Sequence, residues 1–147
     1  MKIKAPSLTA GALVLLAFAS ICLVSCGRGK TEKLLLDKKW GVIDVTPPGG
    51  TFSIEASNRA RDLKNGFYKN AWFKFLPDSI FIASFSGKAD SGKYHISGDG
   101  QTISLYPKHG GKMYEQIEIR HLTTDQLTFN TAIADFHMTL HLKAASH

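Results

Sequence analysis

Short apolar segments separated by turn residues fill most of this chain, and this pattern constrains the fold more than any other feature. After Gly66 the segments are residues 67–76, 80–85, 93–97, 102–106, 112–122, 126–131 and 134–143. Turn residues stand between them, as in Pro77-Asp78-Ser79 and Gly98-Asp99-Gly100. Apolar segments this short, bounded by such residues, predict β-strands joined by hairpins.

A further strand and one helix precede these segments. Residues 40–46 predict a strand that stops at residues 47–50, where two prolines and two glycines cannot extend a ladder. In residues 53–65 apolar side chains recur at helical spacing. Ser53 is the expected N-cap of this helix, and Glu55 lies in its first turn, where the helix dipole favours a carboxylate.

Eight short strands, with one short helix between the first and the second, predict an all-β protein. Because the strands follow one another through hairpins, we expect an eight-stranded up-and-down barrel, whose closure removes exposed sheet edges. An open sandwich of two sheets is the structural alternative. A barrel of eight strands has an interior that side chains fill or that holds one small ligand, so the strand count leaves both interiors open.

The residues before the barrel come in the order of an export signal. Lys2 and Lys4 are positive, no acid precedes Cys26, and residues 8–24 form an apolar run. This run is shorter than the roughly 20 residues that a bilayer-spanning helix needs, and Arg28 follows it closely. These features favour a cleaved signal peptide over a membrane span.

The stretch Leu23-Val24-Ser25-Cys26 resembles the bacterial lipobox. This resemblance implies that residues 1–25 are removed as a lipoprotein signal peptide and that Cys26 carries the lipid. Two or three acyl chains give stable membrane anchoring, whereas one chain gives reversible binding. Ordinary secretion and an uncleaved anchor are the alternatives.

After cleavage before Cys26, we expect two parts. Residues 26–33 form a lipidated polar tether, and residues 34–147 form a single barrel domain. Gly27, where an aspartate would mark inner-membrane retention, resembles the pattern of outer-membrane lipoproteins. We therefore expect the protein to be lipid-anchored at the outer membrane and to face the periplasm.

Little in the sequence indicates catalysis, a cofactor or a metal. Cys22, the other cysteine, lies in the apolar run, so the mature chain has no thiol for a disulfide, a zinc site or a nucleophile. There is no Gly-X-Ser-X-Gly elbow and no phosphate-binding glycine loop. His137 and His141 stand on one strand about 13 Å apart, too far to share an ion. We expect no enzymatic activity, no cofactor and no metal.

The charge pattern argues against nucleic acid as a partner. The formal net charge is +6, and basic residues are scattered along the chain rather than clustered among aromatic residues. Arg28, Lys30 and Lys33 lie beside the expected anchor. A membrane surface, contacted through the lipid and these residues, is the expected partner.

Aromatic residues on the predicted inner face are the main candidates for ligand contacts. They are Phe73, Phe75, Phe81, Phe85 and Phe129. They form either an apolar pocket or a filled core. The outer face of the same two strands also carries apolar residues, including Trp72, Ile80 and Ile82, which either the helix covers or a partner contacts.

Glu115 breaks the pattern of its strand. It lies in phase with Met113 and Ile117 and therefore points into the barrel, unless a bulge rotates it outward. A buried carboxylate needs a partner. Contact with a ligand head group is one interpretation; a bulge or a neighbouring lysine is the alternative.

Several features together resemble the lipocalin-like lipoproteins of Bacteroidetes-type bacteria. They are the lipobox, Leu34-Leu35-Leu36 followed by Trp40, the helix, the aromatic strands 71–75 and 80–82, Ser91-Gly92-Lys93-Tyr94, Gly98-Asp99-Gly100, and the turn at residues 122–127. The resemblance implies a lipocalin-like barrel in which Trp40 packs at the base. Two functions follow as hypotheses. The first is binding of a small hydrophobic or amphipathic ligand in the barrel; the alternative is an envelope module with a filled barrel that binds a protein, as an inhibitor or assembly accessory.

Overall fold

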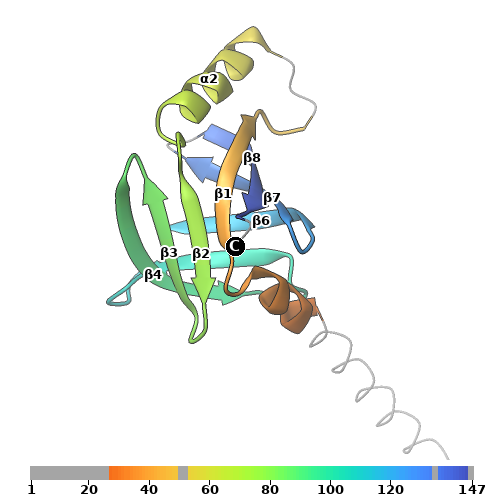
Figure 1. Cartoon of the computed structure of the whole chain (residues 1–147), viewed down its shortest axis with the longest axis vertical. Coiled ribbons are helices and arrows are strands. Elements are labelled where there is room, and N and C mark those ends of the chain that lie inside the picture. Colours follow the sequence, from red (N-terminus) through yellow and green to blue (C-terminus); the bar gives the residue numbers. More distant parts are fainter. Residues whose placement is uncertain (1–26, 50–52, 134–135, 146–147) are drawn as a thin grey trace, which may run out of the picture.

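The computed structural model describes residues 27–49, 53–133 and 136–145, and all structural statements below concern these residues (Figure 1). The expected signal peptide at residues 1–25 and the lipidated Cys26 lie outside them.

The chain forms a closed antiparallel barrel whose strands pair in sequence order, with β8 returning to β1. The strands are β1 (Lys39–Thr46), β2 (Trp72–Leu76), β3 (Ile80–Phe85), β4 (Lys88–Ile96), β5 (Thr102–Pro107), β6 (Glu115–Leu122), β7 (Gln126–Ile133) and β8 (Phe136–Ala144). One helix, α2 (Ile54–Asn65), lies between β1 and β2. The predicted all-β class, the eight-stranded up-and-down barrel and the position of this helix are confirmed, and the open sandwich is excluded.

The predicted element boundaries differ most at two connections, the one from α2 to β2 and the hairpin between β3 and β4. The strand predicted to begin at residue 67 begins at Trp72, because the preceding residues form turns in which the Tyr68 N–H donates to the Leu63 carbonyl. The loop predicted at residues 86–91 shrinks to Ser86-Gly87, where both residues have positive φ, 48° and 80°. Positive φ at both central positions is the geometry of a two-residue hairpin turn, so β4 begins early, at Lys88.

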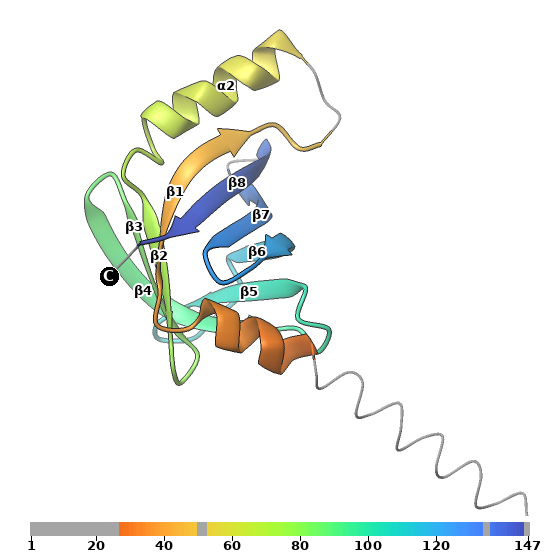
Figure 2. The ribbon, with the colours of Figure 1, turned by 45° about the vertical axis from the view of Figure 1, so that its right-hand side comes forward.

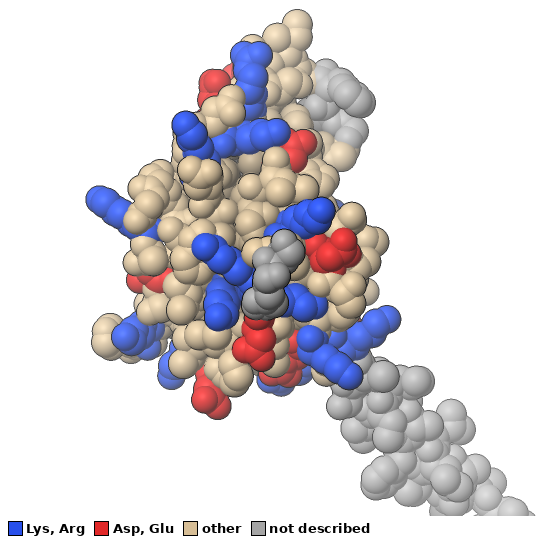
Figure 3. Space-filling view, viewed as in Figure 1, with Lys and Arg blue, Asp and Glu red and all other residues tan. Residues whose placement is uncertain are grey.

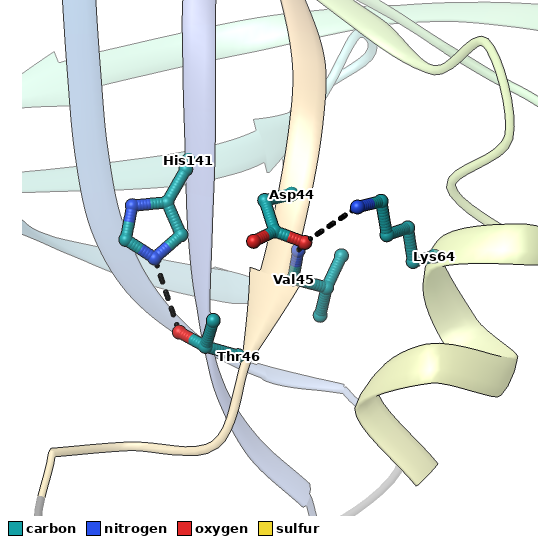
Figure 4. A network of polar contacts seen from close by, with 5 residues as sticks. All are labelled: Asp44, Val45, Thr46, Lys64 and His141. Carbon is teal, nitrogen blue, oxygen red and sulfur yellow. Dashed lines mark hydrogen bonds and ion pairs between the residues drawn. The ribbon is translucent and has the colours of Figure 1, made fainter. Parts of the chain in front are cut away.

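Helix α2 begins as the sequence predicts. Ser53 is its N-cap, with extended backbone, and the Ser53 hydroxyl accepts a 3.0 Å hydrogen bond from the Ala56 N–H. The helix packs chiefly against β1, and Lys64 Nζ lies 2.8 Å from Asp44 Oδ1 on that strand (Figure 4). The alternative in which α2 covers the outer face of β2 and β3 is therefore wrong.

Residues 27–35 are helical, whereas we expected a polar tether without regular structure. The Thr31 hydroxyl donates a 2.9 Å hydrogen bond to the Gly100 carbonyl in the β4–β5 turn, and Leu35 is buried. The Leu35 carbonyl accepts a 3.1 Å hydrogen bond from the indole of Trp40. The segment therefore packs on one end of the barrel and closes it (Figure 2).

The hydrophobic core fills the barrel interior. In β2 the buried residues alternate with half-buried ones, so Phe73 and Phe75 point inward and Trp72 points outward. Within the described residues every buried hydrophobic side chain lies between Leu35 and Leu142. The chain from residue 27 onward thus carries the core on which its folding depends. None of the helices in the described part is long and apolar enough to cross a membrane.

Candidate ligand-binding site

A cavity of about 250 Å³ remains open inside the barrel. Its lining includes Phe85 at the end of β3, Asp90 near the start of β4 and Glu115 at the start of β6. The helical residues 27–35 contact the turn after β4, at the other end of these strands. The cavity therefore lies in the half of the barrel that the N-terminal helix does not close.

Phenylalanine rings form the apolar wall of this cavity. Phe73 meets Phe129 edge-on with ring centroids 5.7 Å apart, and meets Phe85 in the same way at 5.4 Å. Phe67, from the turn before β2, stacks on Phe85 at 4.9 Å. Because these rings interlock, the wall is a rigid surface rather than a set of mobile side chains.

Four of the five predicted phenylalanines line the cavity: Phe73, Phe81, Phe85 and Phe129. Phe75, which we also proposed as a lining residue, does not. It is 1% exposed and packs edge-on against Tyr94 with centroids 5.2 Å apart. It lies two residues further along β2 toward the closed end, where side chains fill the barrel. The interior is thus filled at one end and open at the other.

Trp40 lies at the closed end, as the resemblance to lipocalin-like proteins implies. Its side chain is fully buried, with an exposure of 0%, and its indole N–H is satisfied by the Leu35 carbonyl. The Lys38 ammonium lies 5.5 Å from the centre of the Trp40 rings. The Trp40 side chain thus closes the base of the barrel, and its one polar group, the indole N–H, has a hydrogen-bond partner.

Glu115 points into the barrel and is held by neither of the alternatives that the sequence left open. Its carboxylate accepts a 2.6 Å hydrogen bond from the Thr131 hydroxyl and a 3.2 Å bond from the Ala132 N–H. The irregularity in β6 lies further along, between Ile119 and His121, and no lysine in the described part of the chain forms an ion pair with Glu115. The partners of Glu115 are a hydroxyl and a backbone amide of β7.

These hydrogen bonds cross a gap in the barrel wall. The β6–β7 ladder runs from the pair Glu118–Asn130 to the pair Leu122–Leu127, so Glu115 lies outside it. An open cleft of about 520 Å³ occupies this region and shares Tyr114, Glu115 and Thr131 with the inner cavity. The Glu115 carboxylate therefore borders both the cavity and the cleft.

Tyr68 places a polar group on the cavity wall without a protein partner. The residue is 2% exposed, and its hydroxyl makes no hydrogen bond to any of the residues that the structure describes. Burial, together with the nearby Glu115 carboxylate, raises the pKa of Tyr68 well above its usual value. The hydroxyl is thus protonated at neutral pH, and a buried unpaired hydroxyl is energetically costly.

Tyr114 and Asp90 complete the polar side of the cavity. The Tyr114 ring lies 6.2 Å from that of Phe81, and the residue is 54% exposed. Partial burial raises the pKa of Tyr114 to about 12, and the carboxylates of Asp90 and Glu115 add to this effect. Asp90 accepts a 2.7 Å hydrogen bond from the Ser91 N–H.

Sequence reasoning missed Tyr68, Asp90 and Tyr114. Tyr68 and Tyr114 precede strands and have no alternation to place them. Asp90 was assigned to a loop, but β4 alternates inward at this position. The signal was available, since Asp90 stands in phase with Tyr94 and Ile96, which are both buried.

The outer surface differs from the cavity in character. Lys39 Nζ lies 4.6 Å from the centre of the Trp72 ring, and Ile80 is 39% exposed. Lysine and arginine side chains are spread over the visible face rather than gathered in one patch (Figure 3).

His137 and His141 do not converge on a metal site. Nε2 of His141 lies 3.0 Å from the Thr46 hydroxyl (Figure 4). Nδ1 of the same ring lies 3.4 Å from the Thr128 hydroxyl. Across the described ranges, no three histidine, cysteine, aspartate or glutamate residues come together as metal ligands.

The comparisons with known proteins give similarities of structure. No family model matches the chain, and no curated protein matches it. The NMR structure of a protein from Bacteroides uniformis matches with a TM-score of 0.49 and 20% identity, over 80% of this chain and 93% of that one. The crystal structure of a DUF4847 family protein from Bacteroides vulgatus matches with a TM-score of 0.45 and 9% identity, over 79% and 98%. Neither description names a ligand or an activity.

Proposed function

We propose that this protein is a lipid-anchored envelope lipoprotein that binds a small hydrophobic or amphipathic molecule inside its barrel. The observation that carries the proposal is the cavity of about 250 Å³, with an aromatic wall and an unpaired buried hydroxyl on Tyr68. A filled barrel would offer no such space. The proposed role is binding, without a catalytic step.

The cavity volume limits the size of the ligand. Pockets for drug-sized molecules measure roughly 300–1,000 Å³, whereas an apolar cavity of about 150 Å³ accommodates benzene. A volume of about 250 Å³ therefore suits a substituted single ring or a short branched chain. The interlocked rings of Phe73, Phe85 and Phe129 support the apolar part of such a ligand.

The polar side of the cavity favours an amphipathic ligand over a hydrocarbon. Tyr68, Asp90 and Glu115 all line it, so one end of the bound molecule meets hydrogen-bonding groups. A hydrocarbon would leave the Tyr68 hydroxyl unpaired, and that penalty is removed by a ligand with a polar end.

Native mass spectrometry of the chain from residue 27 onward, expressed without residues 1–26, tests the cavity. We expect a retained small molecule, or a rise in melting temperature with single-ring aromatic compounds, because a ligand that binds the folded state stabilises it. Ala83 is buried in the cavity wall, so Ala83→Met should fill the space and abolish binding. Ala89→Met, at an exposed position of β4, is the matched control. No retained molecule and no thermal shift across the panel would refute the binding function.

The anchor and location are proposed from the sequence. Metabolic labelling with palmitate should mark the protein, and Cys26→Ser should abolish the label while Cys22→Ser keeps it. Fractionation should place the protein in the outer membrane, and a non-penetrating reagent should leave it unlabelled on intact cells. Strong labelling of intact cells would instead place the domain on the cell surface.

A protein-binding function is the second candidate, and one observation favours it. Helix α2 packs on β1, so the apolar outer face at Ile80 and Ile82 stays without that cover. Photo-crosslinking from position 80 in cells should then capture one reproducible envelope protein, and Ile82→Lys in the same chain should abolish this capture. The same crosslink from exposed position 55 on α2, away from this face, is the control for proximity alone.

A further inference from the structure

We propose that the ligand's polar end is an ammonium group, held by the carboxylates of Asp90 and Glu115 and the hydroxyl of Tyr68, while its apolar part lies against the phenylalanine wall. This inference rests on the binding function proposed above and adds the chemical class of the ligand: a small aromatic or aliphatic amine.

The charge of the cavity lining is the first argument. Asp90 and Glu115 both line the cavity, and among the described residues that line it there is no lysine, arginine or histidine. The chain as a whole is basic, with a formal net charge of +6, so this acidic site runs against the overall charge. An anionic head group would meet two carboxylates with no counter-charge on the wall, whereas a cation is attracted by both.

Each carboxylate accepts hydrogen bonds from the protein and retains accepting capacity; Asp90 is exposed, and Glu115 is half-buried. Asp90 Oδ1 accepts from the Ser91 N–H, and Glu115 Oε1 accepts from Thr131 and Ala132. An ionised carboxylate offers about four acceptor positions. The protein bonds therefore orient the two groups and leave lone pairs for an ammonium, whose N–H groups all donate.

The unpaired hydroxyl of Tyr68 is the second, independent argument. Tyr68 lines the cavity, its hydroxyl is almost fully buried, and no group in the described part of the chain bonds to this hydroxyl. Its oxygen carries lone pairs that can accept an N–H from the ligand. A bound amine thus pairs a group that the empty site leaves unsatisfied.

The aromatic rings of Phe81 and Tyr114, which line the cavity, are the third argument for a cationic ligand. The Phe81 and Tyr114 rings lie 6.2 Å apart, beside the two acidic residues. Gly92 permits this placement of Phe81, because a Cβ there would lie 2.6 Å from the ring carbon Cε1. Aromatic rings attract cations through their faces, most strongly where water is excluded.

Three probes of one shape and different charge test the inference. They are 2-phenylethylamine, 2-phenylethanol and phenylacetate, titrated calorimetrically into the chain from residue 27 onward. We expect the amine to bind at least about tenfold more tightly than the alcohol, and the acid most weakly, because hydrogen bonds to a charged group exceed those to a neutral one. Equal affinities of amine and alcohol would overturn the ammonium assignment and leave the binding function standing. Failure of all three probes, with an empty native mass spectrum, would overturn both.

Single substitutions locate the charge recognition. Glu115→Gln keeps an oxygen that accepts from Thr131 and Ala132, and Asp90→Asn likewise keeps its acceptor for Ser91. Each should weaken amine binding much more than alcohol binding and so reduce the amine-to-alcohol affinity ratio by about tenfold. Asp78→Asn, in the β2–β3 turn at the other end of the barrel, is the matched control for a lost negative charge. An equal reduction in the control would assign the preference to overall charge and refute the site.

Tyr68→Phe tests the hydroxyl separately, because this substitution leaves the charge of the cavity unchanged. It should weaken amine binding as well.

Discussion

The carboxylate of Glu115 and the hydroxyl of Thr131 join through a 2.6 Å hydrogen bond where the ladder between β6 and β7 is absent. The bond replaces backbone pairing that the neighbouring strands have elsewhere. The Glu115 side chain thus closes part of the wall and, at the same time, presents its charge to the cavity.

The first prediction concerns this closure. Glu115→Ala should lower the free energy of unfolding by about 1–2 kcal/mol, because the Thr131 hydroxyl and the Ala132 N–H lose their partner. Glu115→Gln should cost less, since the amide oxygen still accepts both bonds. Urea denaturation measures the two values, and equal losses in the two variants would show that charge rather than hydrogen bonding closes the gap.

The second prediction concerns the link between Asp44 and Lys64. The Lys64 ammonium, with a 2.8 Å contact, is the main cause that lowers the pKa of Asp44 below its usual value. A lowered folded-state pKa stabilises the protein above the unfolded pKa near 4, and this contribution is lost as the pH falls through the folded-state pKa. Both side chains are nearly half exposed, so Asp44→Asn should cost less than about 1 kcal/mol at pH 7.

The measurement for Asp44 is a pair of unfolding curves from pH 7 to pH 2. The difference between the native protein and Asp44→Asn should shrink as the acid protonates, and 1 M salt should shrink it at pH 7. Glu55→Gln, at the exposed end of α2, is the control. A difference that persists unchanged at low pH would assign the effect to packing instead.

The third prediction concerns alkaline stability. Burial raises the pKa of Tyr114 to about 12 and that of Tyr68 further. A raised folded-state pKa gives stability that is complete below the unfolded tyrosine pKa near 10 and is lost as the pH rises. Unfolding free energy should therefore fall above about pH 10, and Tyr68→Phe should flatten this fall. Carbon NMR of labelled tyrosines follows each ionisation directly; a Tyr114 midpoint near pH 10 would show that its partial burial and the nearby carboxylates of Asp90 and Glu115 do not raise its pKa.

The fourth prediction compares two glycines that share a left-handed backbone. Gly87 and Gly100 have φ values of 80° and 75°, but only the second is crowded: a Cβ at Gly100 would lie 2.6 Å from the Thr31 hydroxyl, and one at Gly87 meets no atom within 4 Å. Gly87→Ala should cost about 1 kcal/mol from backbone strain alone. Gly100→Ala should cost more and should release residues 27–35 from the barrel.

Hydrogen exchange reads out the fourth prediction. In Gly100→Ala the amides near Leu35 should exchange faster while the amides of β7 and β8 stay protected. Equal destabilisation of the two variants, with unchanged exchange near Leu35, would show that the helix does not depend on this turn.

The barrel could be predicted because each strand carries its own local signal, an alternation of apolar and polar residues between turn residues. Tyr94 and Ile96 alternate with polar residues, and Ser53 has the chemistry of an N-cap, so each local signal agrees with the final fold. The start of β4 could not be predicted, because Ser86 adopts a positive φ that serine rarely takes.

The phenylalanines that form the cavity wall could be predicted from the sequence, whereas the arrangement of its polar groups could not. The inward phase of Phe73 and Phe129 follows from alternation, but the partners of Glu115 lie in a gap that depends on how two distant strands separate. The helix at residues 27–35 escaped prediction for a similar reason. Its order depends on the docking of Thr31 and Leu35 onto a turn far along the chain.

The docked helix also sets a direction for ligand exchange. If Cys26 carries the proposed lipid, the sealed base is the end of the barrel nearer the anchor, and the cavity opens roughly 20 Å away, the length of a strand of about six residues. Molecules then enter from the aqueous compartment rather than by lateral diffusion out of the lipid leaflet. Uptake should accordingly depend on a compound's concentration in water and be indifferent to the composition of the membrane beneath.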